Sequence, residues 1–170
     1  MAKKKAAKQG RAGTPALQVL DAHGVDFELI EYKHSRVMEK GYALDTARVL
    51  GVNPECVLKT LMVEADGKPA VGVVQADRLL NLKQIARALG AKHAQMMDPA
   101  KAERLTGYVT GGISPLGQRT LLPTVIDADA EHADEVVVSG GKRTLSIRLA
   151  PADLAALTKA VFAPISDRRP

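Results

Sequence analysis

The sequence predicts an α/β (mixed α+β) domain whose mixed, partly antiparallel curved sheet is flanked by helices. Segments with helical spacing of apolar residues alternate with short strand-like runs. Two pairs of these runs are joined by short turns, at Asp66-Gly67 and Gly140-Gly141, as is typical of antiparallel hairpins. The 170 residues contain no internal repeat and no linker that would divide them, so we expect a single domain.

In the first half of the chain, helix and strand signals follow one another closely. Thr14-Pro15 is an N-cap followed by proline at the first helical position, and Gly24 is a typical helix end. Gly51 closes a second helix in the same way, and an irregular segment precedes that helix. The predicted elements are a helix over 15–23, a strand over 27–32, a helix over 42–50, and strands over 57–63 and 70–75.

The second half repeats this mixture around a glycine-rich loop, predicted over 106–117. Asp-Pro at 98–99 is typical of a helix start, and Gly90 marks the end of the helix before it. The predicted elements are a helix ending at Gly90, a helix over 98–105, and strands over 122–127, 135–139 and 145–149. A final helix from Pro151 is predicted to present Leu154, Leu157 and Val161 on one face.

The positive charge of the chain is concentrated at its N-terminus. Five of the 24 lysines and arginines fall within the first eleven residues, which contain no acid, and the rest of the chain has as many bases as acids. We therefore predict a basic disordered tail over 1–13, the folded domain over 14–163 and a C-terminal tail over 164–170. An arm that attracts phosphates is the alternative interpretation of the basic tail.

Composition excludes several classes of function. Aromatic residues make up 3% of the chain, which disfavours a protein that stacks many exposed bases. Cys56 is the sole cysteine, so no intramolecular disulfide can form, and no segment has the length of a membrane span or the pattern of a secretory signal. The four histidines lack metal-site spacing. We expect a cytoplasmic protein that needs no metal and no cofactor.

Lys59 is the most informative residue, because it interrupts an apolar strand. Side chains alternate along a strand, so Lys59 shares a face with Val57, Leu61 and Val63. An ammonium on an apolar face is costly unless it is paired or opens into a polar cavity, although a lysine stem can also pack while its head reaches water. Together with the glycine pairs at 111–112 and 140–141, Lys59 favours a pocket for a polar or anionic ligand.

These residues resemble the YbaK/EbsC family, specifically its cysteinyl-tRNA(Pro) deacylases, which are related to the editing domain inserted in some prolyl-tRNA synthetases. The resemblance spans about residues 14–163. The segments that carry it are Val57-Leu58-Lys59-Thr60-Leu61, residues 82–92, residues 106–117 with Gly-Gly-Ile-Ser-Pro-Leu-Gly, and Ser139-Gly140-Gly141-Lys142-Arg143.

The resemblance implies a trans-acting editing deacylase that removes mischarged cysteine from tRNA(Pro), with tRNA(Cys) as a further candidate. In that family the substrate's own thiol is thought to attack its ester carbonyl and release a thiolactone, so the protein supplies positioning and charge stabilisation. The implied partners are aminoacylated tRNA(Pro) and, as a candidate, prolyl-tRNA synthetase, with no membrane.

The resemblance also implies a set of site residues. Lys59 would be the catalytic residue, acting by electrostatic positioning of the 3′-terminal adenosine phosphate or the ester. The glycine pair would offer backbone groups to the aminoacyl moiety, and the remaining side chains would form the pocket wall. The implied substrate-binding residues are Tyr32, Tyr42, Thr60, Gly111, Gly112, Ser139 and Ser146.

Ser146 departs from the family pattern, because relatives carry an aspartate at this position after the Ser-Gly-Gly turn. A carboxylate there could pair with a lysine, so its loss leaves the selectivity of the pocket open. Two alternatives follow: a deacylase that clears alanine or another small amino acid by water attack, and a non-catalytic module that binds tRNA or the synthetase.

Overall fold

The computed structural model describes residues 13–38 and 40–169. The predicted basic tail therefore lies, apart from Gly13, outside the described residues. The helices in the described part are α1 (Pro15–His23), α2 (Tyr42–Leu50), α3 (Leu82–Ala88), α4 (Pro99–Thr106) and α5 (Pro151–Thr158), with short 3₁₀ turns at η1 (Pro54–Cys56) and η2 (Ala128–His132). None of these helices is both long and apolar enough to cross a membrane.

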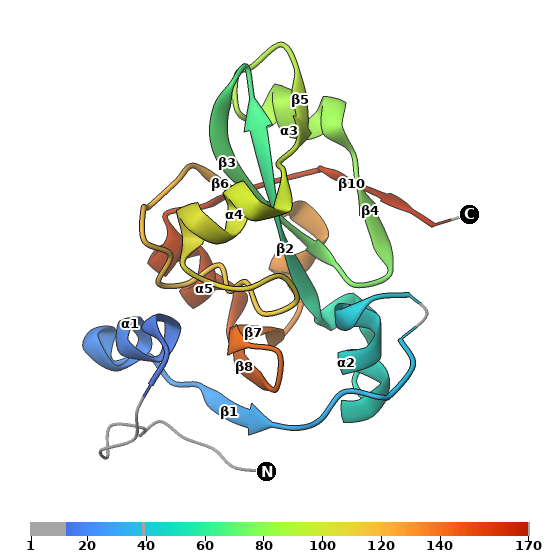
Figure 1. Cartoon of the computed structure of the whole chain (residues 1–170), viewed down its shortest axis with the longest axis vertical. Coiled ribbons are helices and arrows are strands. Elements are labelled where there is room, and N and C mark those ends of the chain that lie inside the picture. The colour runs from blue at the N-terminus through green and yellow to red at the C-terminus, as the bar shows by residue number, and fades with distance from the viewer. Residues whose placement is uncertain (1–12, 39, 170) are drawn as a thin grey trace.

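The strands form three sheets rather than the single sheet expected, and the predicted mixed α/β class is confirmed (Figure 1). The strands are β1 (Glu28–Glu31), β2 (Leu58–Ala65), β3 (Lys68–Gln75), β4 (Arg78–Leu80), β5 (Ala94–Met96), β6 (Thr124–Asp127), β7 (Val136–Lys142), β8 (Leu145–Leu149), β9 (Val161–Ala163) and β10 (Ser166–Arg168).

The largest sheet has the order β5-β2-β3-β6-β9 and mixes both kinds of pairing. The β2–β3 hairpin is antiparallel and turns at Asp66 and Gly67, whose φ angles of 49° and 80° match the predicted tight turn. The β3–β6 and β6–β9 pairs are parallel. The partly antiparallel character inferred from the sequence is thus confirmed.

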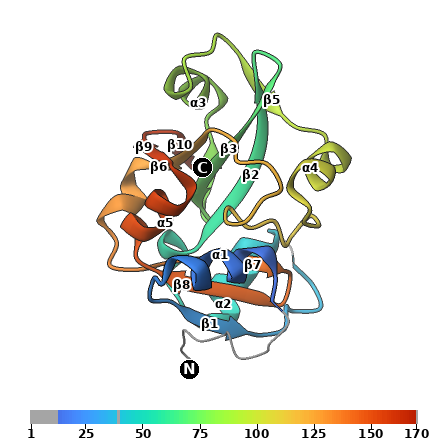
Figure 2. The same cartoon turned by 90° about the vertical axis from the view of Figure 1, so that its left-hand side faces the viewer.

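A second, antiparallel sheet has the order β1-β8-β7, and α1 lies across it in Figure 2. The two larger sheets meet at an isolated parallel bridge between Val57, just before β2, and Val137 in β7. A continuous core fills the junction, with Leu58 and Met62 from β2 and Val138 from β7 all buried. This junction positions the candidate site.

The chain departs from the predicted elements at two places near its C-terminal end. Gly140 and Gly141 do not form a turn, because β7 continues to Lys142 through a bulge that begins after Ser139. Val161 does not lie on α5: the helix ends at Thr158, Lys159 takes the left-handed conformation at φ 57°, and Val161 starts β9.

Residues after Ala163, assigned to a tail from the sequence, contribute to the fold. Ile165 is fully buried beneath the large sheet, and its N–H donates to Oδ1 of Asp127 at 3.0 Å. Residues 166–168 form β10, which pairs with β4 in a two-stranded sheet. The described part of this segment is therefore held in place up to Arg168.

Candidate active site

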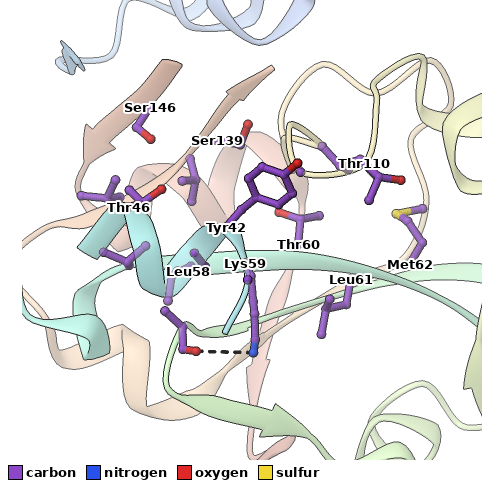
Figure 3. Close-up of a pocket in the computed structure, with 18 of the residues that line it drawn as sticks. Tyr42, Thr46, Leu58, Lys59, Thr60, Leu61, Met62, Thr110, Ser139 and Ser146 are labelled. Carbon is purple, nitrogen blue, oxygen red and sulfur yellow. Dashed lines mark hydrogen bonds between the residues drawn. The ribbon is translucent and has the colours of Figure 1, made fainter. Parts of the chain in front are cut away.

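A cavity of about 370 Å³, hereafter the main cavity, lies between β2, the β7–β8 pair, α2 and the loop over 106–117 (Figure 3). Its wall brings together seven of the eight site residues predicted from the sequence, from segments more than a hundred residues apart. These seven residues are Tyr32, Tyr42, Lys59, Thr60, Gly111, Ser139 and Ser146. Gly112 does not line the main cavity.

The alternation of β2 separates the two polar residues at its start. Thr60 lies opposite Val73 of β3, and both belong to the face that meets the β7–β8 sheet. Lys59 lies opposite Val74, whose side chain packs with Ile85 on the other face. In Figure 3 the Lys59 ammonium accordingly points away from Tyr42 and Ser139, although part of Lys59 still lines the main cavity.

The Thr60 hydroxyl is a polar group left available for a ligand. Its Oγ1 atom is buried and has no hydrogen-bond partner among the described residues. Leaving a buried hydroxyl unpaired costs about 1–3 kcal/mol, so such a group in a cavity wall indicates a role for the missing partner. Thr60 thus lines the main cavity with a hydroxyl that no described protein group satisfies.

Tyr32 lines the main cavity and makes two hydroxyl contacts with neighbouring elements. Its Oη lies 2.8 Å from Oγ1 of Thr46 in α2 and 2.9 Å from Oγ of Ser146 in β8. The backbone N–H of Tyr32 also donates to Thr144 O at 3.0 Å, extending the β1–β8 pairing. Ser146 is thus buried as a partner of Tyr32, at the position where a carboxylate was expected in relatives.

An aromatic wedge that the sequence did not single out holds the two tyrosines apart. The His34 ring makes edge contacts with both Tyr32 and Tyr42, each with ring centroids 5.1 Å apart. His34 Nδ1 lies 2.8 Å from Oδ2 of Asp45, a buried residue of α2. The isolated histidine lacked any motif spacing, so only the fold reveals this role.

Asp45 stays ionised although it is buried. Burial opposes its charge, but hydrogen bonds from Ser35, His34 and Arg48 outweigh that effect and hold the pKa of the Asp45 carboxyl well below its usual range. The Ser35 N–H donates at 2.9 Å, and Arg48 Nη2 lies 2.6 Å from Oδ1. The carboxylate therefore anchors the segment before α2 to the helix itself.

Gly111 lets the loop lie directly on the Tyr42 ring. Its φ of +88° suits glycine, and a Cβ atom there would come within 2.6 Å of the ring. The Arg143 guanidinium covers the same ring, 5.1 Å from its centroid, and donates from Nε to Thr110 O at 2.9 Å. Tyr42 is thus clasped between the loop and the β7–β8 turn.

Gly112 shapes this clasp instead of facing the cavity. Its N–H donates to Val109 O at 2.8 Å, and a Cβ atom would press against the backbone of Lys142 and Arg143 at 3.0 Å. The amide is therefore occupied inside the loop, in contrast to the expectation that it serves the ligand. Ser139 lines the main cavity and accepts a hydrogen bond from Gly141 N at 3.1 Å within the bulge.

The Lys59 ammonium is half-buried and weakly satisfied. Its Nζ lies 3.5 Å from Ala76 O, the limit of a hydrogen bond. Burial lowers the pKa of Lys59 to about 8, and the nearby positive charge of Arg169 lowers it further, while Asp77 partly opposes the shift. The fold thus holds a cation on the side of β2 where Asp77 and Arg169 lie.

The described lining of the main cavity is chemically selective. It carries hydroxyl groups and lysines, but no carboxylate, imidazole or thiol side chain. Cys56 is not among its residues, and no group of three or more acidic, histidine or cysteine side chains in the described ranges could hold a metal ion. The described lining therefore offers hydroxyl groups and lysines to a ligand, without a histidine or carboxylate base among them.

Comparison with known proteins finds relatives that match all or part of this chain. A protein of Enterococcus faecalis, whose assignment as the Cys-tRNA(Pro)/Cys-tRNA(Cys) deacylase EbsC is itself provisional, is 32% identical over 99% of both chains. A proline–tRNA ligase of Nitratidesulfovibrio vulgaris is 29% identical over 61% of this chain, which corresponds to 18% of the ligase. The chain thus matches only about a fifth of that ligase.

A solved structure described as that of a candidate trans-editing enzyme for prolyl-tRNA synthetase superposes with a TM-score of 0.76. It is 25% identical and covers 89% of this chain and 92% of its own. The aminoacyl-tRNA editing domain family matches residues 41–157, which include α2, the glycine-rich loop and the β7–β8 pair. On these grounds the chain belongs to the aminoacyl-tRNA editing domain family.

Proposed function

We propose that this aminoacyl-tRNA editing deacylase removes cysteine from mischarged tRNA(Pro), with cysteine on tRNA(Cys) as a second substrate. The full-length similarity to the Enterococcus faecalis protein supports the choice of cysteine. The partial similarity to a proline–tRNA ligase supports tRNA(Pro), and the synthetase is the partner we propose. Cytoplasmic location stays a prediction.

The composition of the main cavity wall carries the proposal. Hydrolysis by water or by a protein nucleophile usually relies on a histidine or carboxylate as general base, and the described lining contains neither; lysines are its only side chains with a basic nitrogen. A cysteinyl ester brings its own nucleophile. The wall then has to hold the substrate in an attack geometry, which alone can lower a barrier by about 7–11 kcal/mol.

In the proposed reaction the substrate sulfur forms a bond to its own carbonyl carbon. The ester bond between that carbon and the ribose oxygen breaks, and the thiol proton ends on the ribose oxygen. The products are the cysteine thiolactone and tRNA with a free terminal hydroxyl, and no oxidant or further reactant is needed. The available Thr60 hydroxyl is a donor for charge that develops on the carbonyl oxygen.

Lys59 is assigned a separate part of this reaction. Its ammonium lies on the other side of β2 from Thr60, where it can attract the anionic RNA at the edge of the main cavity. We therefore propose that Lys59 orients the 3′-terminal nucleotide, while the hydroxyl-lined wall accepts the aminoacyl group. A pocket discriminates near-isosteric amino acids by only about 10–200-fold, which is the reason for a second, editing site.

Deacylation of tRNA(Pro) charged with cysteine, serine or alanine tests the proposal. We expect rapid loss of cysteine and at least a hundredfold slower loss of serine, which matches cysteine in shape but lacks the thiol. Equal rates for cysteine and serine would contradict the thiol mechanism. Preferred release of alanine would instead support water attack, and saturable binding without turnover would identify a non-catalytic tRNA-binding module.

A further inference from the structure

A second cavity of about 710 Å³, hereafter the basic cavity, lies next to the main cavity. The two share Lys40 and Gly41 in their walls, so they adjoin at the start of α2. Its other walls come from the segment before α2 and from the C-terminal end of the described chain. The residues that line it are Val37, Met38, Lys40, Gly41, Leu44, Asp45, Arg48, Asp77, Arg78, Arg168 and Arg169.

Some of the charges around this cavity are already balanced within the fold. Arg48 pairs with Asp45 at 2.6 Å, where Asp45 also serves His34. Arg78 is buried and pairs with Asp129 at 2.8 Å. These arginines therefore carry little unneutralised charge into the cavity.

Three other cations at the basic cavity have no acidic partner among the described residues. Lys40, Arg168 and Arg169 make no ion pair with any residue that the structure describes, and all three are exposed at its wall. The unneutralised positive charge of the wall therefore comes from these three side chains. Beyond residue 11 the chain holds equal numbers of bases and acids, so a generally basic surface does not explain the cluster.

Two further features show that the fold keeps like charges together at this place. Arg168 lies directly opposite Arg78 in the β10–β4 pair, and Asp129 pairs with Arg78 but not with Arg168. The ammonium of Lys59 is near enough to Arg169 for the two charges to repel, as the lowered pKa of Lys59 reflects. An anion bound near Arg169 would relieve the repulsion between Arg169 and Lys59.

The acids of the described lining do not supply that anion. Asp45 is occupied by Arg48, His34 and Ser35. Asp77 has a buried Oδ1 with no hydrogen-bond partner among the described residues, so a single carboxylate faces the remaining cations. A bound chain of phosphates would meet both guanidinium and ammonium donors here, which is the chemistry that arginine and lysine serve best.

We propose that the basic cavity binds the phosphodiester backbone of a single-stranded RNA 3′ end, whose aminoacylated terminal nucleotide enters the main cavity. The inference rests on the proposed function for the identity of the RNA. Lys40 and Gly41 line both cavities, so an RNA end that contacts these residues can reach from one cavity to the other. Figure 1 shows the end of β10 on the same side of the molecule as α2, and Arg168 lines the basic cavity together with Lys40 and Gly41.

The test compares two charge-reversed variants in binding to a fluorescent RNA oligonucleotide that ends in CCA. The first is Arg168→Glu/Arg169→Glu, in the basic cavity. The matched control, Lys83→Glu/Arg87→Glu, alters net charge equally on exposed positions of α3, which line neither cavity. We expect the cavity variant to bind at least tenfold more weakly and the control to stay within about threefold of wild type.

Salt dependence separates backbone contacts from general attraction. Each phosphate contact with a single strand contributes about −0.7 to the slope of log K against log salt. The cavity variant replaces two arginines, so its slope should be shallower than that of wild type by about 1.4. Equal losses in the cavity variant and the control would overturn the proposal. Unlabelled adenosine monophosphate and the unlabelled trinucleotide CCA are compared as competitors of the fluorescent oligonucleotide. Equal displacement by the two would also overturn the proposal, because a site for a single nucleotide would then explain the charges.

Two further arms keep the outcome interpretable. Lys40→Glu/Arg169→Glu alters the same cavity without touching a strand, so it replaces the first variant if thermal unfolding shows that β10 is lost. Deacylation of cysteinyl-tRNA(Pro) and of the cysteinyl ester of adenosine, which has no phosphates, is measured in parallel. A raised KM confined to the tRNA supports the basic cavity, whereas a wild-type protein that binds RNA but deacylates neither substrate refutes the proposed function alone.

Discussion

Lys59 and Thr60 are adjacent in the chain, yet β2 directs their side chains to opposite faces of the large sheet. The hydroxyl faces the main cavity without a partner in the described structure, and the ammonium lies near Ala76 O. In the function we propose, this division separates the group that contacts the aminoacyl moiety from the group that attracts RNA. A substitution at either position should therefore affect a different step.

Replacing Lys59 by methionine should stabilise the fold and abolish deacylation. Burial lowers the pKa of Lys59 to about 8, so the charged form is disfavoured in the folded protein at pH 7. One pKa unit corresponds to about 1.4 kcal/mol, and partial solvation reduces the effect, so we expect a gain of about 1–2 kcal/mol. Urea unfolding of wild type and Lys59→Met measures the gain.

The pH dependence of this gain has a definite sign. Between pH 8 and 10.5 the unfolded chain retains a proton that folded Lys59 has lost, so the wild-type free energy of unfolding rises with pH. The advantage of Lys59→Met should therefore shrink over that interval. An advantage that is constant from pH 7 to pH 10.5 would show that the ammonium is not disfavoured by burial, and Lys59→Met that deacylates at the wild-type rate would remove Lys59 from the site.

Gly111→Ala should disturb the Tyr42 clasp, and Gly90→Ala is its matched control. Both glycines have positive φ, so both alanine variants carry backbone strain of about 1 kcal/mol. The two positions differ in the space around an added Cβ atom. At Gly90 no atom lies within 4 Å of it, whereas at Gly111 the Tyr42 ring lies 2.6 Å away. We expect the free energy of unfolding of Gly111→Ala to fall by about 1–3 kcal/mol more than that of the control. Gly111→Ala should also deacylate more slowly than the control.

A double variant identifies the source of that loss. Tyr42→Ala removes the ring, so Gly111→Ala in the Tyr42→Ala background should lose no more stability than Gly90→Ala does. Thermal unfolding of the four proteins gives the coupling between the two positions. Additive losses at Gly111 and Tyr42 would mean that the loop does not rest on the ring.

Local signals were sufficient for most elements, because their cause is local. The Thr14 hydroxyl caps α1 by accepting from Leu17 N, and Gly24 ends the helix at φ 65°, both as the sequence predicted. The end of α5 was different. No glycine or proline marks the end of α5. Lys159 adopts the left-handed conformation there, and the chain continues into β9, which pairs with β6. Long-range strand pairing overrides local preference there.

The candidate site shows the same boundary between local and distant information. The alternation of β2 placed Lys59 correctly on the apolar face, but the position of that face relative to the main cavity depends on how two sheets meet. His34 carried no motif, because its role arises from contact with rings at 32 and 42 and with a carboxylate in α2. The basic cavity likewise joins α2 to residues more than a hundred positions later.

Ser146→Asp should weaken the fold, with a stronger effect at high pH. Ser146 is 2% exposed and lies 2.9 Å from Tyr32 Oη, so a carboxylate there gains one hydrogen bond but loses its hydration. We expect a loss of about 1–3 kcal/mol at pH 8. Burial would raise the pKa of the new carboxyl, so the loss should lessen as pH falls to 5. Urea unfolding at the two pH values measures it.

Ser146→Ala is the control for this substitution, because it adds no charge. Tyr32 keeps its contact with Thr46, so the expected loss is about 1 kcal/mol and is independent of pH. A Ser146→Asp protein that is as stable at pH 8 as at pH 5 would mean that the cavity solvates a carboxylate freely. The site could then accept, without other changes, the aspartate that the family resemblance implies for this position.

Asp45→Asn should reduce the sensitivity of the fold to acid. Hydrogen bonds from Ser35, His34 and Arg48 hold the pKa of Asp45 below its value in the unfolded chain, despite burial. The carboxylate therefore contributes stability that is fully present above about pH 4 and is lost as pH falls toward the folded pKa. The variant should be less stable than wild type at pH 7, yet lose less stability between pH 5 and pH 3.

The exposed Asp134→Asn, whose carboxylate makes no ion pair with the described residues, is the control and should follow the wild-type curve in urea unfolding at each pH. If Asp45→Asn instead parallels wild type down to pH 3, the charge of Asp45 does not hold the segment before α2, and His34 needs another explanation for its place between the two tyrosines.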